Sequence, residues 1–437
     1  MQVAVIGMGY VGLTAALGLA ESGHDVLGID HDEHRVALLR ERCCPFHEPD
    51  VAEALLTTTV TFRRTLDVPV DAVIIAVSAP LDASGAVDLA NVQSVLAELL
   101  SAGSLPELVV VKSTIPPGTS EGWAARFPAL RRVYAHNPEF LNQGRALADW
   151  QAPDRIVLGL WNGELLPLLG ALYHDKTAPR VVVGPTEAEA VKYASNAFLA
   201  TKISFANEIA NFCGEHGIDV DAVLGGVALD PRMGRGFWRP GIGYGDSCLG
   251  KDVTALTRFA RRRGRPMTML ESVAEVNDRQ LRLPIEIVAH ETAAGAPPPE
   301  VAVLGLLYEP GSDDMRAAPS RTVVPGLAAI AADVRVWDPV LSQQVFADLF
   351  PGVRRTAGLK EAVLDASVVL VLTEFPEVLA IDWTALAQLA RPDCLVVDAK
   401  NALERSDVEA AGLRYRGVGR AGGGRGAAAA EQDVDAK

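Results

Sequence analysis

The sequence predicts an α/β protein with two Rossmann-like, doubly wound parallel-sheet domains joined by a mostly helical central segment. Three observations support this fold class: apolar strand-like runs alternate with helix-like runs early in the chain, a glycine motif follows the first run, and the alternation restarts near residue 300. With 437 residues, 49% apolar and 22% charged, the chain has the length of two or three domains. This composition excludes a disordered, collagenous or coiled-coil protein.

The N-terminal domain is predicted over residues 1–185. Its candidate strands are short apolar runs separated by helix-like stretches, at residues 3–6, 25–29, 72–77, 108–111 and 155–158. Gly184 and Pro185 mark the end of this domain, because both residue types interrupt regular structure.

The remaining chain is predicted to form a central helical segment over residues 186–295 and a C-terminal domain over residues 296–420. A glycine-rich loop at residues 234–250 interrupts the helical pattern, and a proline-rich linker at residues 295–299 precedes the second domain. The candidate strands of that domain lie at residues 301–305, 334–338, 368–372 and 395–398. The tail, residues 421–437, is rich in glycine and alanine and is predicted to be disordered.

Charge and cysteine content narrow the classes of function. Forty Lys and Arg against 55 Asp and Glu give a net charge of −15, which argues against binding a nucleic acid polymer or an anionic membrane. The five cysteines include no Cys-x-x-Cys pair and no metal-like spacing, so neither a disulfide framework nor a metal site is expected. Residues 1–20 lack a basic leader and no long apolar run occurs, which predicts a cytoplasmic protein without a membrane span.

The cofactor site is predicted at the GMGYVG motif, residues 7–12, which follows a candidate strand and opens a candidate helix. The glycines allow close approach of the backbone to a pyrophosphate, and the helix N-terminus supplies amide donors. Asp30 ends the next strand, where a carboxylate accepts from a ribose 2′-hydroxyl and repels a 2′-phosphate, so NAD is predicted over NADP. Arg35 would lie over the adenine or stand exposed on its helix. The motif residues assigned to NAD are Gly7, Gly9, Tyr10, Val11 and Gly12. The alternative is an ordinary glycine turn.

Cys248 is the candidate nucleophile, because it lies in a glycine-rich loop just before Lys251 and Asp252. A lysine nearby favours the thiolate, and in a nicotinamide enzyme a thiolate traps an aldehyde as a thiohemiacetal that is then oxidised to a thioester. The alternative is a small buried apolar residue. That interpretation is kept for Cys43, Cys44, Cys213 and Cys394.

From Met1 to about residue 420 the chain resembles the nucleotide-sugar 6-dehydrogenases, the family of UDP-glucose, GDP-mannose and N-acetylated UDP-hexosamine dehydrogenases. Within this family the resemblance is strongest to the UDP-glucose 6-dehydrogenases. Several stretches in one order carry the resemblance, in addition to the Cys248 loop. They are GMGYVGL (7–13), KSTIPPGT (112–119), NPEFL (137–141), PDRIV (153–157), KYASNAFLATKISFANE (192–208) and DDMR (313–316).

The resemblance implies roles for residues that are otherwise ordinary. Cys248 would be the nucleophile, Lys192 and Asn196 would stabilise the oxyanion from one helix face, and three residues would position or activate water: Thr114, Glu139 and Asp252. Further residues implied at the cofactor are Ser78, Ser113, Thr114, Gln143, Lys251 and Arg316. Residues implied at the substrate are Glu139, Phe140, Leu141, Lys192, Asn196, Arg232, Phe237, Tyr244, Gly245, Tyr308, Glu309 and Lys400.

The resemblance also implies a homodimer formed through the long helix around residues 195–215, with Arg232 reaching the substrate of the neighbouring subunit. The substrate would be a small nucleotide or nucleotide sugar.

Several positions depart from the family pattern, mainly on the substrate side. Tyr308-Glu309 replaces a usual Phe-Lys pair, and Lys400 replaces a frequent arginine. A unit charge pair at ~4 Å and an effective dielectric of ~20 is worth about 4 kcal/mol, so reversing one charge weakens binding of a diphosphate. We therefore keep open an atypical nucleotide with fewer phosphates or a modified sugar. The sequence is also compatible with a two-electron hydroxyacid dehydrogenase and with a nucleotide-binding protein that has no activity.

Overall fold

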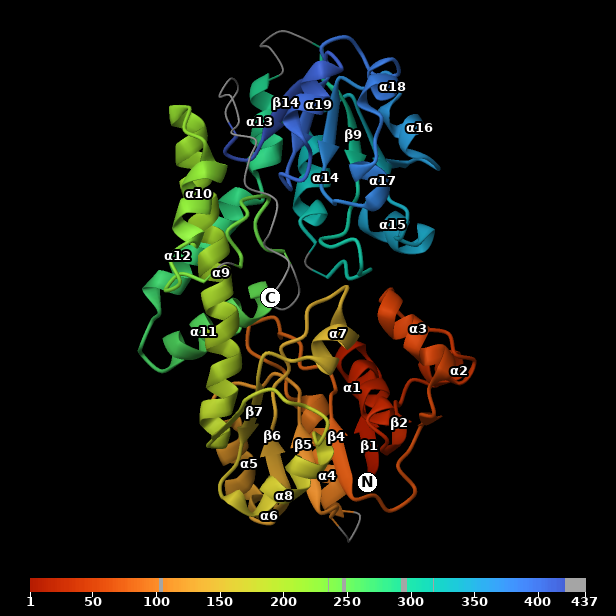
Figure 1. Ribbon diagram of the computed structural model, residues 1–437, viewed down its shortest axis with the longest axis vertical. Coiled ribbons are helices and arrows are strands. Elements are labelled where there is room, and N and C mark those ends of the chain that lie inside the picture. Colours follow the sequence, from red (N-terminus) through yellow and green to blue (C-terminus); the bar gives the residue numbers. More distant parts are fainter. Residues whose placement is uncertain (102–104, 235, 246–248, 292–296, 317, 421–437) are drawn as a thin grey trace. The chain divides into compact units, whose positions relative to one another are not determined.

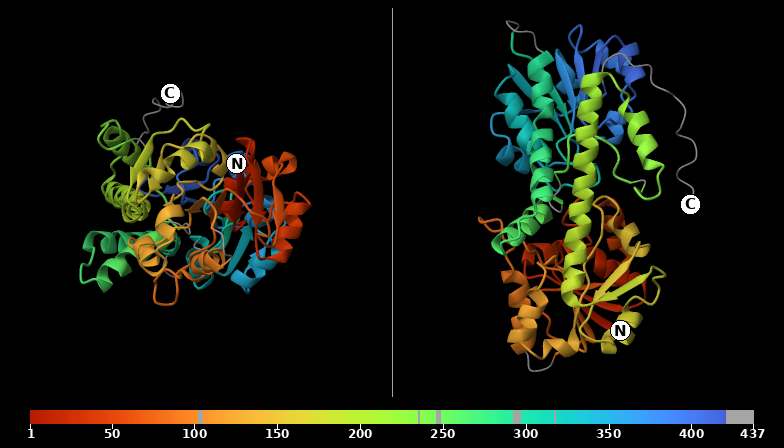
Figure 2. Two further views of the ribbon diagram at one scale, coloured as in Figure 1. Left: turned by 90° about the horizontal axis from the view of Figure 1, so that it is seen from below. Right: turned by 90° about the vertical axis from the view of Figure 1, so that its left-hand side faces the viewer.

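The computed structural model describes residues 1–437 except 102–104, 235, 246–248, 292–296, 317 and 421–437. The chain divides into two compact units. Unit 1 comprises Met1–Ala197, Lys251–Met267 and Gly311–Asp313, and unit 2 comprises Phe198–Gly250, Thr268–Pro310 and Asp314–Lys437. The 32-residue helix α9 (Pro185–His216) contributes residues to both units and is continuous (Figure 2).

Unit 1 contains an eight-stranded sheet in the order β3-β2-β1-β4-β5-β6-β7-β8 (Figure 1). All neighbouring strands are parallel except β6 and β7. The strands are β1 (Gln2–Ile6), β2 (Asp25–Ile29), β3 (Thr61–Arg63), β4 (Ala72–Ile75), β5 (Leu108–Val111), β6 (Tyr134–His136), β7 (Ile156–Gly159) and β8 (Arg180–Val183). The five predicted strands are confirmed. Strands β3, β6 and β8 were not predicted. Strands β3 and β6 have three residues each, too few to show an apolar alternation, and β8 directly precedes the Gly184-Pro185 break.

Helices cover both faces of this sheet. Successive residues of β1 point to opposite faces: Val3 and Val5 pack in one core with α1, α2, α3, α7 and α8, whereas Ala4 packs in a second core with α4, α5 and α6. These helices are α1 (Tyr10–Glu21), α2 (Glu33–Arg40), α3 (Pro49–Thr57), α4 (Ala90–Ser101), α5 (Thr119–Arg126), α6 (Leu130–Val133), α7 (Ala146–Gln151) and α8 (Leu166–Leu172), with a 3-10 turn η1 (Gly163–Leu165). Unit 1 also holds most of α11 (Leu249–Arg262).

A buried carboxyl group joins α3 to α7. Glu48, at the N-cap of α3, is 1% exposed and accepts hydrogen bonds from the backbone N–H groups of Gly144 (2.9 Å) and Ala146 (3.0 Å). Burial raises the pKa of Glu48 to about 7, since it outweighs these two hydrogen bonds. The neighbouring Asp50 raises the pKa further.

Replacing this carboxyl group (Glu48→Gln) is expected to flatten the pH dependence of stability. The folded-state pKa lies above the ordinary value, so the stabilisation from this group is complete below pH ~4.5 and is lost as the pH rises through ~7, by about 3 kcal/mol at most. Urea unfolding at pH 5 and at pH 7.5 measures the difference. Glu53→Gln, an exposed position on the same helix, should keep the wild-type slope. Equal slopes in all three proteins would contradict the prediction.

Unit 2 contains a six-stranded parallel sheet in the order β11-β10-β9-β12-β13-β14. The strands are β9 (Glu300–Leu304), β10 (Asp333–Trp337), β11 (Arg354–Arg355), β12 (Val368–Val371), β13 (Leu395–Asp398) and β14 (Arg414–Gly417). Around the sheet lie α14 (Ser320–Ala328), α15 (Gln343–Leu349), α16 (Leu359–Val363), α17 (Pro376–Leu379), α18 (Trp383–Ala387) and α19 (Arg405–Ala410). The unit also includes α10 (Val220–Ala228), α12 (Thr268–Gln280) and α13 (Leu283–Glu291).

The two sheets share one type of hydrogen bond, which joins the loop after the first strand to an aspartate after the second strand. In unit 1 the N–H of Met8 donates to the Asp30 carboxylate (2.8 Å), and in unit 2 the N–H of Leu306 donates to the Asp338 carboxylate (2.8 Å). Both sheets also place the first strand beside the fourth, the order of a doubly wound fold. The predicted fold class is therefore confirmed.

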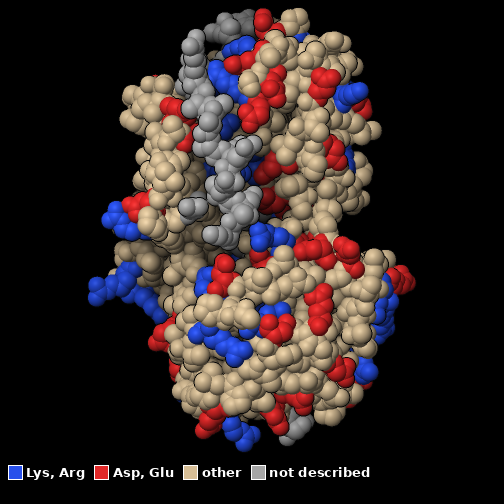
Figure 3. Space-filling view, viewed as in Figure 1, with Lys and Arg blue, Asp and Glu red and all other residues tan. Residues whose placement is uncertain are grey.

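Two general properties of the described residues bear on function. None of the helices placed in the structure has the length and apolar character needed to cross a membrane. On the face shown in Figure 3, acidic and basic side chains lie interspersed in small groups.

Candidate active site

The glycine motif forms the turn between β1 and α1, and two of its positions accept only glycine. Gly7 has φ +96°, and a Cβ atom there would lie 2.8 Å from the carbonyl oxygen of Ala76. A Cβ atom on Gly12 would overlap the carbonyl oxygen of Gly7. The N-cap residue Gly9 provides no side-chain cap at the start of α1, and a helix N-terminus of this kind fits the pyrophosphate of a dinucleotide.

The predicted ribose-binding carboxylate ends β2 and is held rigidly. Asp30 is 3% exposed, and its oxygens accept from the N–H groups of Met8 (2.8 Å) and Asp32 (3.0 Å). The Arg35 guanidinium donates to the same carboxylate at 3.1 Å, with 37% of its side chain exposed. Arg35 is thus an ion-pair partner of Asp30 at the predicted adenosine end of the site, an arrangement that the sequence did not indicate.

Removing the carboxylate (Asp30→Ala) is expected to raise the KM for NAD about tenfold to a hundredfold. The reason is the loss of a charge-assisted hydrogen bond to a ribose hydroxyl, worth roughly 1.5–3 kcal/mol. Initial rates at varied NAD and NADP concentrations measure the effect, and the ratio of NADP to NAD use should rise. Asp32→Ala, which removes the N-cap of α2 instead, serves as the control. An unchanged KM for NAD would refute the ribose contact.

The carboxyl ends of the unit 1 strands gather the predicted residues along one edge of the sheet, as in other parallel sheets that bind nucleotides. The residues that follow β1, β2, β4, β5 and β6 are, in that order, Gly7, Asp30, Ser78, Ser113 and Glu139. The Ser113 hydroxyl donates to the carbonyl of Val77 (2.6 Å), and the half-buried Thr114 follows it.

A buried ion pair lies beside this edge. The Lys192 ammonium on α9 is 2.9 Å from the Glu139 carboxylate, with side-chain exposures of 5% and 10%. The Leu141 N–H also donates to Glu139 (2.7 Å), and Lys192 lies over the Phe140 ring at 5.4 Å. Burial alone would raise the pKa of Glu139, but the positive charge of Lys192 and the Leu141 hydrogen bond lower it below its ordinary value. Glu139 is therefore held as a carboxylate.

A second polar pair lies one turn further along α9. The Asn196 amide donates to the Asp252 carboxylate on α11 (2.7 Å), and the Lys251 ammonium contacts the other oxygen of Asp252 (2.6 Å). Asp252 is 1% exposed. Helix α9 thus places Lys192 beside Glu139 and Asn196 beside Asp252, an arrangement with donors for a developing oxyanion and acceptors for a proton.

Cys248 lies outside the described residues, as does Asp246. Cys248 directly precedes α11, whose first residues include Lys251 and Asp252. Gln143 is half-buried in the loop after Leu141, and the Tyr10 hydroxyl donates to the neighbouring Asn142 carbonyl (2.5 Å).

The predicted substrate residues of unit 2 lie partly at the carboxyl ends of β9 and β13. The Lys400 ammonium, 11% exposed, is 3.1 Å from the Glu374 carboxylate, donates to the Tyr308 carbonyl (2.9 Å) and lies 4.5 Å from the centre of the Tyr308 ring. Glu309 follows Tyr308 directly. Strands β9 and β12 are where the strand order reverses, the usual ligand position in such sheets.

The other predicted site residues of unit 2 differ in exposure and are not placed together at the ends of β9 and β13. Arg232 is paired with Asp230 and 83% exposed on its side chain, and Arg316 is paired with Asp314 and 73% exposed. Phe237 has φ +66° and is 45% exposed. Tyr244 and Gly245 are buried, and burial raises the pKa of Tyr244 to about 12.

Lys112, in unit 1, is a buried cation near Glu139, and the sequence did not single it out for a role. Its side chain donates to the Asn137 side chain (2.8 Å) and lies 5.2 Å from the centre of the Trp150 ring. Burial lowers the pKa of Lys112 to about 8, while the charge of Glu139 opposes this. Lys112 and Glu139 line one cavity of about 350 Å³. The sequence feature that could have indicated this buried cation is the position of Lys112 directly after the apolar strand β5.

A larger cavity, about 930 Å³, lies beside β10 and α15 and is lined by none of the predicted site residues. Among the residues that the structure places, no group of three His, Cys, Asp or Glu side chains is arranged to hold a metal ion.

Comparison with known proteins matches three domains in order along the chain. They are described as the NAD binding domain (residues 1–177), the central domain (residues 186–279) and the UDP binding domain (residues 302–405) of the UDP-glucose/GDP-mannose dehydrogenase family. The UDP-glucose 6-dehydrogenase of Pseudomonas aeruginosa is 36% identical over 445 residues, covering 96% of this chain and 98% of that protein. The UDP-glucose 6-dehydrogenase TuaD of Bacillus subtilis is 34% identical, covering 96% and 93%.

Solved structures give the same result. A UDP-glucose dehydrogenase from Pyrobaculum islandicum is similar with a TM-score of 0.85 at 34% identity, covering 96% of this chain and 97% of that one. A UDP-D-ManNAc dehydrogenase from Pyrococcus horikoshii is similar with a TM-score of 0.83 at 26% identity, covering 96% and 99%.

Proposed function

Given that this chain belongs to the UDP-glucose/GDP-mannose dehydrogenase family, we propose that it oxidises the primary alcohol of a nucleotide sugar to a carboxylate through a thioester on Cys248. The reference reaction is UDP-glucose to UDP-glucuronate. One alcohol, one water and two NAD⁺ give one carboxylate, two NADH and three protons. The observation that carries the proposal is the pairing, on one helix, of Lys192 with Glu139 and of Asn196 with Asp252.

The residues divide the chemistry between them. NAD, when bound, accepts hydride from the substrate carbon in each oxidation. Asp252 or Glu139 takes the proton of the alcohol through water, and the Cys248 thiolate adds to the aldehyde carbon. Lys192 and Asn196 donate to the oxygen that carries negative charge in the thiohemiacetal. After the second oxidation, water positioned by Thr114 and the carboxylates hydrolyses the thioester and releases the thiolate.

A second candidate substrate class is favoured by the charge around Lys400. This cation is already paired with Glu374 and with the Tyr308 carbonyl, and Glu309 adds another carboxylate to the same end of the sheet. Such a site has less positive charge to offer a diphosphate. The same oxidation on a nucleotide with fewer phosphates or a modified sugar is therefore the second candidate.

Measuring NADH formation separates these substrates. UDP-glucose, UDP-N-acetylglucosamine, GDP-mannose and nucleoside monophosphates are offered separately, and NADH is counted per product. Two NADH per product support the four-electron reaction, and one supports a hydroxyacid dehydrogenase. Efficient turnover of UDP-glucose at a micromolar KM would eliminate the atypical substrate. No NADH from any primary alcohol would refute the proposed function.

A homodimer is proposed from an exposed aromatic stripe on the unit 2 part of α9. Phe198, Phe205 and Phe212 are spaced by seven residues and are 63%, 47% and 53% exposed. A spacing of seven places side chains on one helix face, and such a face of large apolar residues is typical of an interface. A second copy of the chain presents the same stripe, and pairing the two stripes would remove both from water.

Introducing a charge into this stripe (Phe205→Glu) is expected to dissociate the dimer, because two carboxylates would be buried against each other. Light scattering coupled to gel filtration measures the mass, with a shift from a dimer to a monomer at micromolar concentration. Leu379→Glu, at another exposed apolar position (52% exposed), should leave the mass unchanged. A wild-type protein that runs as a monomer would disprove the interface.

A further inference from the structure

The backbone of residues 240–244, just upstream of Cys248, is held by four carboxamide side chains. Three of them come from helices α9 and α12. Asn207 on α9 accepts from the Gly241 N–H (2.8 Å), and Gln280 on α12 donates to the Gly241 carbonyl (2.6 Å). Asn277, also on α12, accepts from the Tyr244 N–H (2.8 Å) and donates to the Tyr244 carbonyl (2.8 Å). All these residues belong to unit 2.

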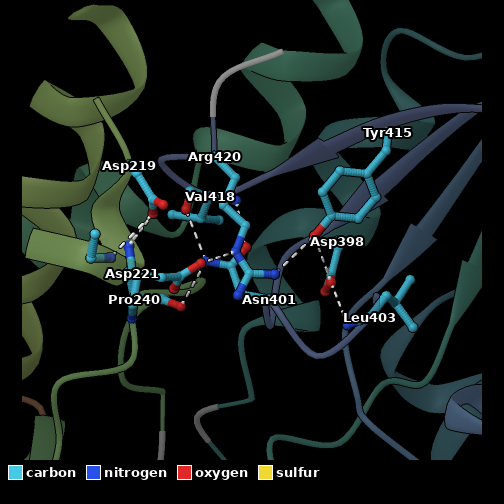
Figure 4. Close-up of polar contacts among 10 residues, drawn as sticks. Asp219, Asp221, Pro240, Asp398, Asn401, Leu403, Tyr415, Val418 and Arg420 are labelled. Carbon is cyan, nitrogen blue, oxygen red and sulfur yellow. Dashed lines mark hydrogen bonds and ion pairs between the residues drawn. The ribbon is translucent and has the colours of Figure 1, made fainter. Parts of the chain in front are cut away.

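The fourth carboxamide lies in the turn after β13 (Figure 4). The Asn401 side chain donates to the carbonyls of Pro240 (3.2 Å) and Val418 (2.8 Å) and accepts from the Val418 N–H (2.9 Å). Its backbone has φ +52°, a conformation that asparagine adopts more readily than most residues. Asn401 therefore ties the start of this segment to the sheet that carries Lys400.

Close packing restricts the same segment. A Cβ atom on Gly241 would lie 3.0 Å from the carbonyl oxygen of Ala399, and one on Gly243, where φ is +94°, would lie 2.5 Å from the Asn277 side chain. Asn207, Asn277 and Gln280 are each at most 5% exposed. Moving the segment would break the hydrogen bonds that these buried amides make to it, which is unfavourable.

We propose that Asn207, Asn277, Gln280 and Asn401 form an amide cradle, a set of positioning residues that holds residues 240–244, the segment upstream of Cys248, in one conformation. The inference rests on the proposed function. Every member of the cradle is neutral and none titrates, so the positioning is independent of pH. Lys400 and Asn401 are neighbours in one turn. The cradle therefore also links residues 240–244 to Lys400, a predicted substrate-binding residue.

The test compares two variants of one network. Asn401→Ala removes the bond to Pro240. Arg420→Ala instead removes an ion pair to Asp221 (2.9 Å) and a bond to the Tyr415 hydroxyl (3.3 Å), and it leaves residues 240–244 untouched (Figure 4). Asn401→Ala should lower kcat by about tenfold with an unchanged KM for NAD, because small displacements of a reacting group are costly to the rate. Arg420→Ala should stay within about twofold of the wild type.

A second readout does not require turnover. The rate at which iodoacetamide alkylates Cys248, followed by peptide mass spectrometry, should change in Asn401→Ala and stay the same in Arg420→Ala. If no substrate is oxidised, the proposed function is refuted. The alkylation rate of Cys248 then still tests whether the cradle positions residues 240–244. Should Asn401→Ala not fold, Asn401→Asp removes the same amide donor and keeps the acceptor for Val418. Wild-type kcat and alkylation in the Asn401 variant, or equal losses in both variants, would overturn the cradle.

Discussion

Replacing the thiol of Cys248 (Cys248→Ser) is expected to abolish formation of the acid product. A serine hydroxyl is not ionised at neutral pH, so neither the hemiacetal nor the ester that would replace the thiohemiacetal and the thioester forms at a useful rate. The alcohol is then oxidised at most to the aldehyde, and the yield falls from two NADH per product to one or none. A fall in acid formation of at least about 10³-fold is expected, and NADH counting with chromatographic analysis of the product measures it.

The matched control is Cys213→Ser, which alters a buried cysteine in α9 without a proposed chemical role. Its product and its NADH yield should match those of the wild type. Unimpaired acid formation by Cys248→Ser would rule out nucleophilic catalysis by this residue.

Removing the ammonium of Lys192 (Lys192→Met) is expected to lower kcat on the order of 10²- to 10³-fold. Loss of one preorganised donor to an oxyanion has an effect of this size. The variant also leaves Glu139 buried without the lysine 2.9 Å away, so the pKa of Glu139 should rise. The acid limb of the kcat/KM profile should therefore move to higher pH, which pH-dependent initial rates measure.

Lys176→Met supplies a control of similar burial. Lys176 is 6% exposed on its side chain and is paired with Asp175 rather than with the proposed catalytic carboxylates. This variant should keep its kcat and its pH profile. A Lys192→Met enzyme with wild-type kcat, or one whose loss is identical at every pH, would contradict the double role of Lys192.

Local patterns explain how much of the fold was predictable. Strands such as β1 and β5 are short apolar runs bounded by polar residues, and the glycine motif has a fixed relation to the strand before it and the helix after it. The predictions of fold class, NAD binding and family membership depend on such local patterns and are confirmed. Strands β3 and β6 have three residues each and lacked enough residues to show a pattern.

The roles of the site residues remain predictions, but the structure brings several of them together. Glu139 contacts Lys192, and Asn196 contacts Asp252, which lies 56 residues away in the sequence. Lys112 illustrates the opposite case: it contacts Trp150 and Asn137, and its burial lowers its pKa, and local sequence indicates neither the contacts nor the burial.

The amino-acid sequence alone was sufficient to predict the doubly wound architecture and the NAD-binding turn, because periodicity and glycine conformation act over a few neighbouring residues. The resemblance of several motifs in one order was sufficient to predict the family. Only the tertiary structure decided which charges meet. The pairing of Lys400 with Glu374 and the four amides around residues 240–244 join segments that are distant in the chain. Such contacts are set by strand order and helix packing, and the strength of each depends on the burial that this packing creates.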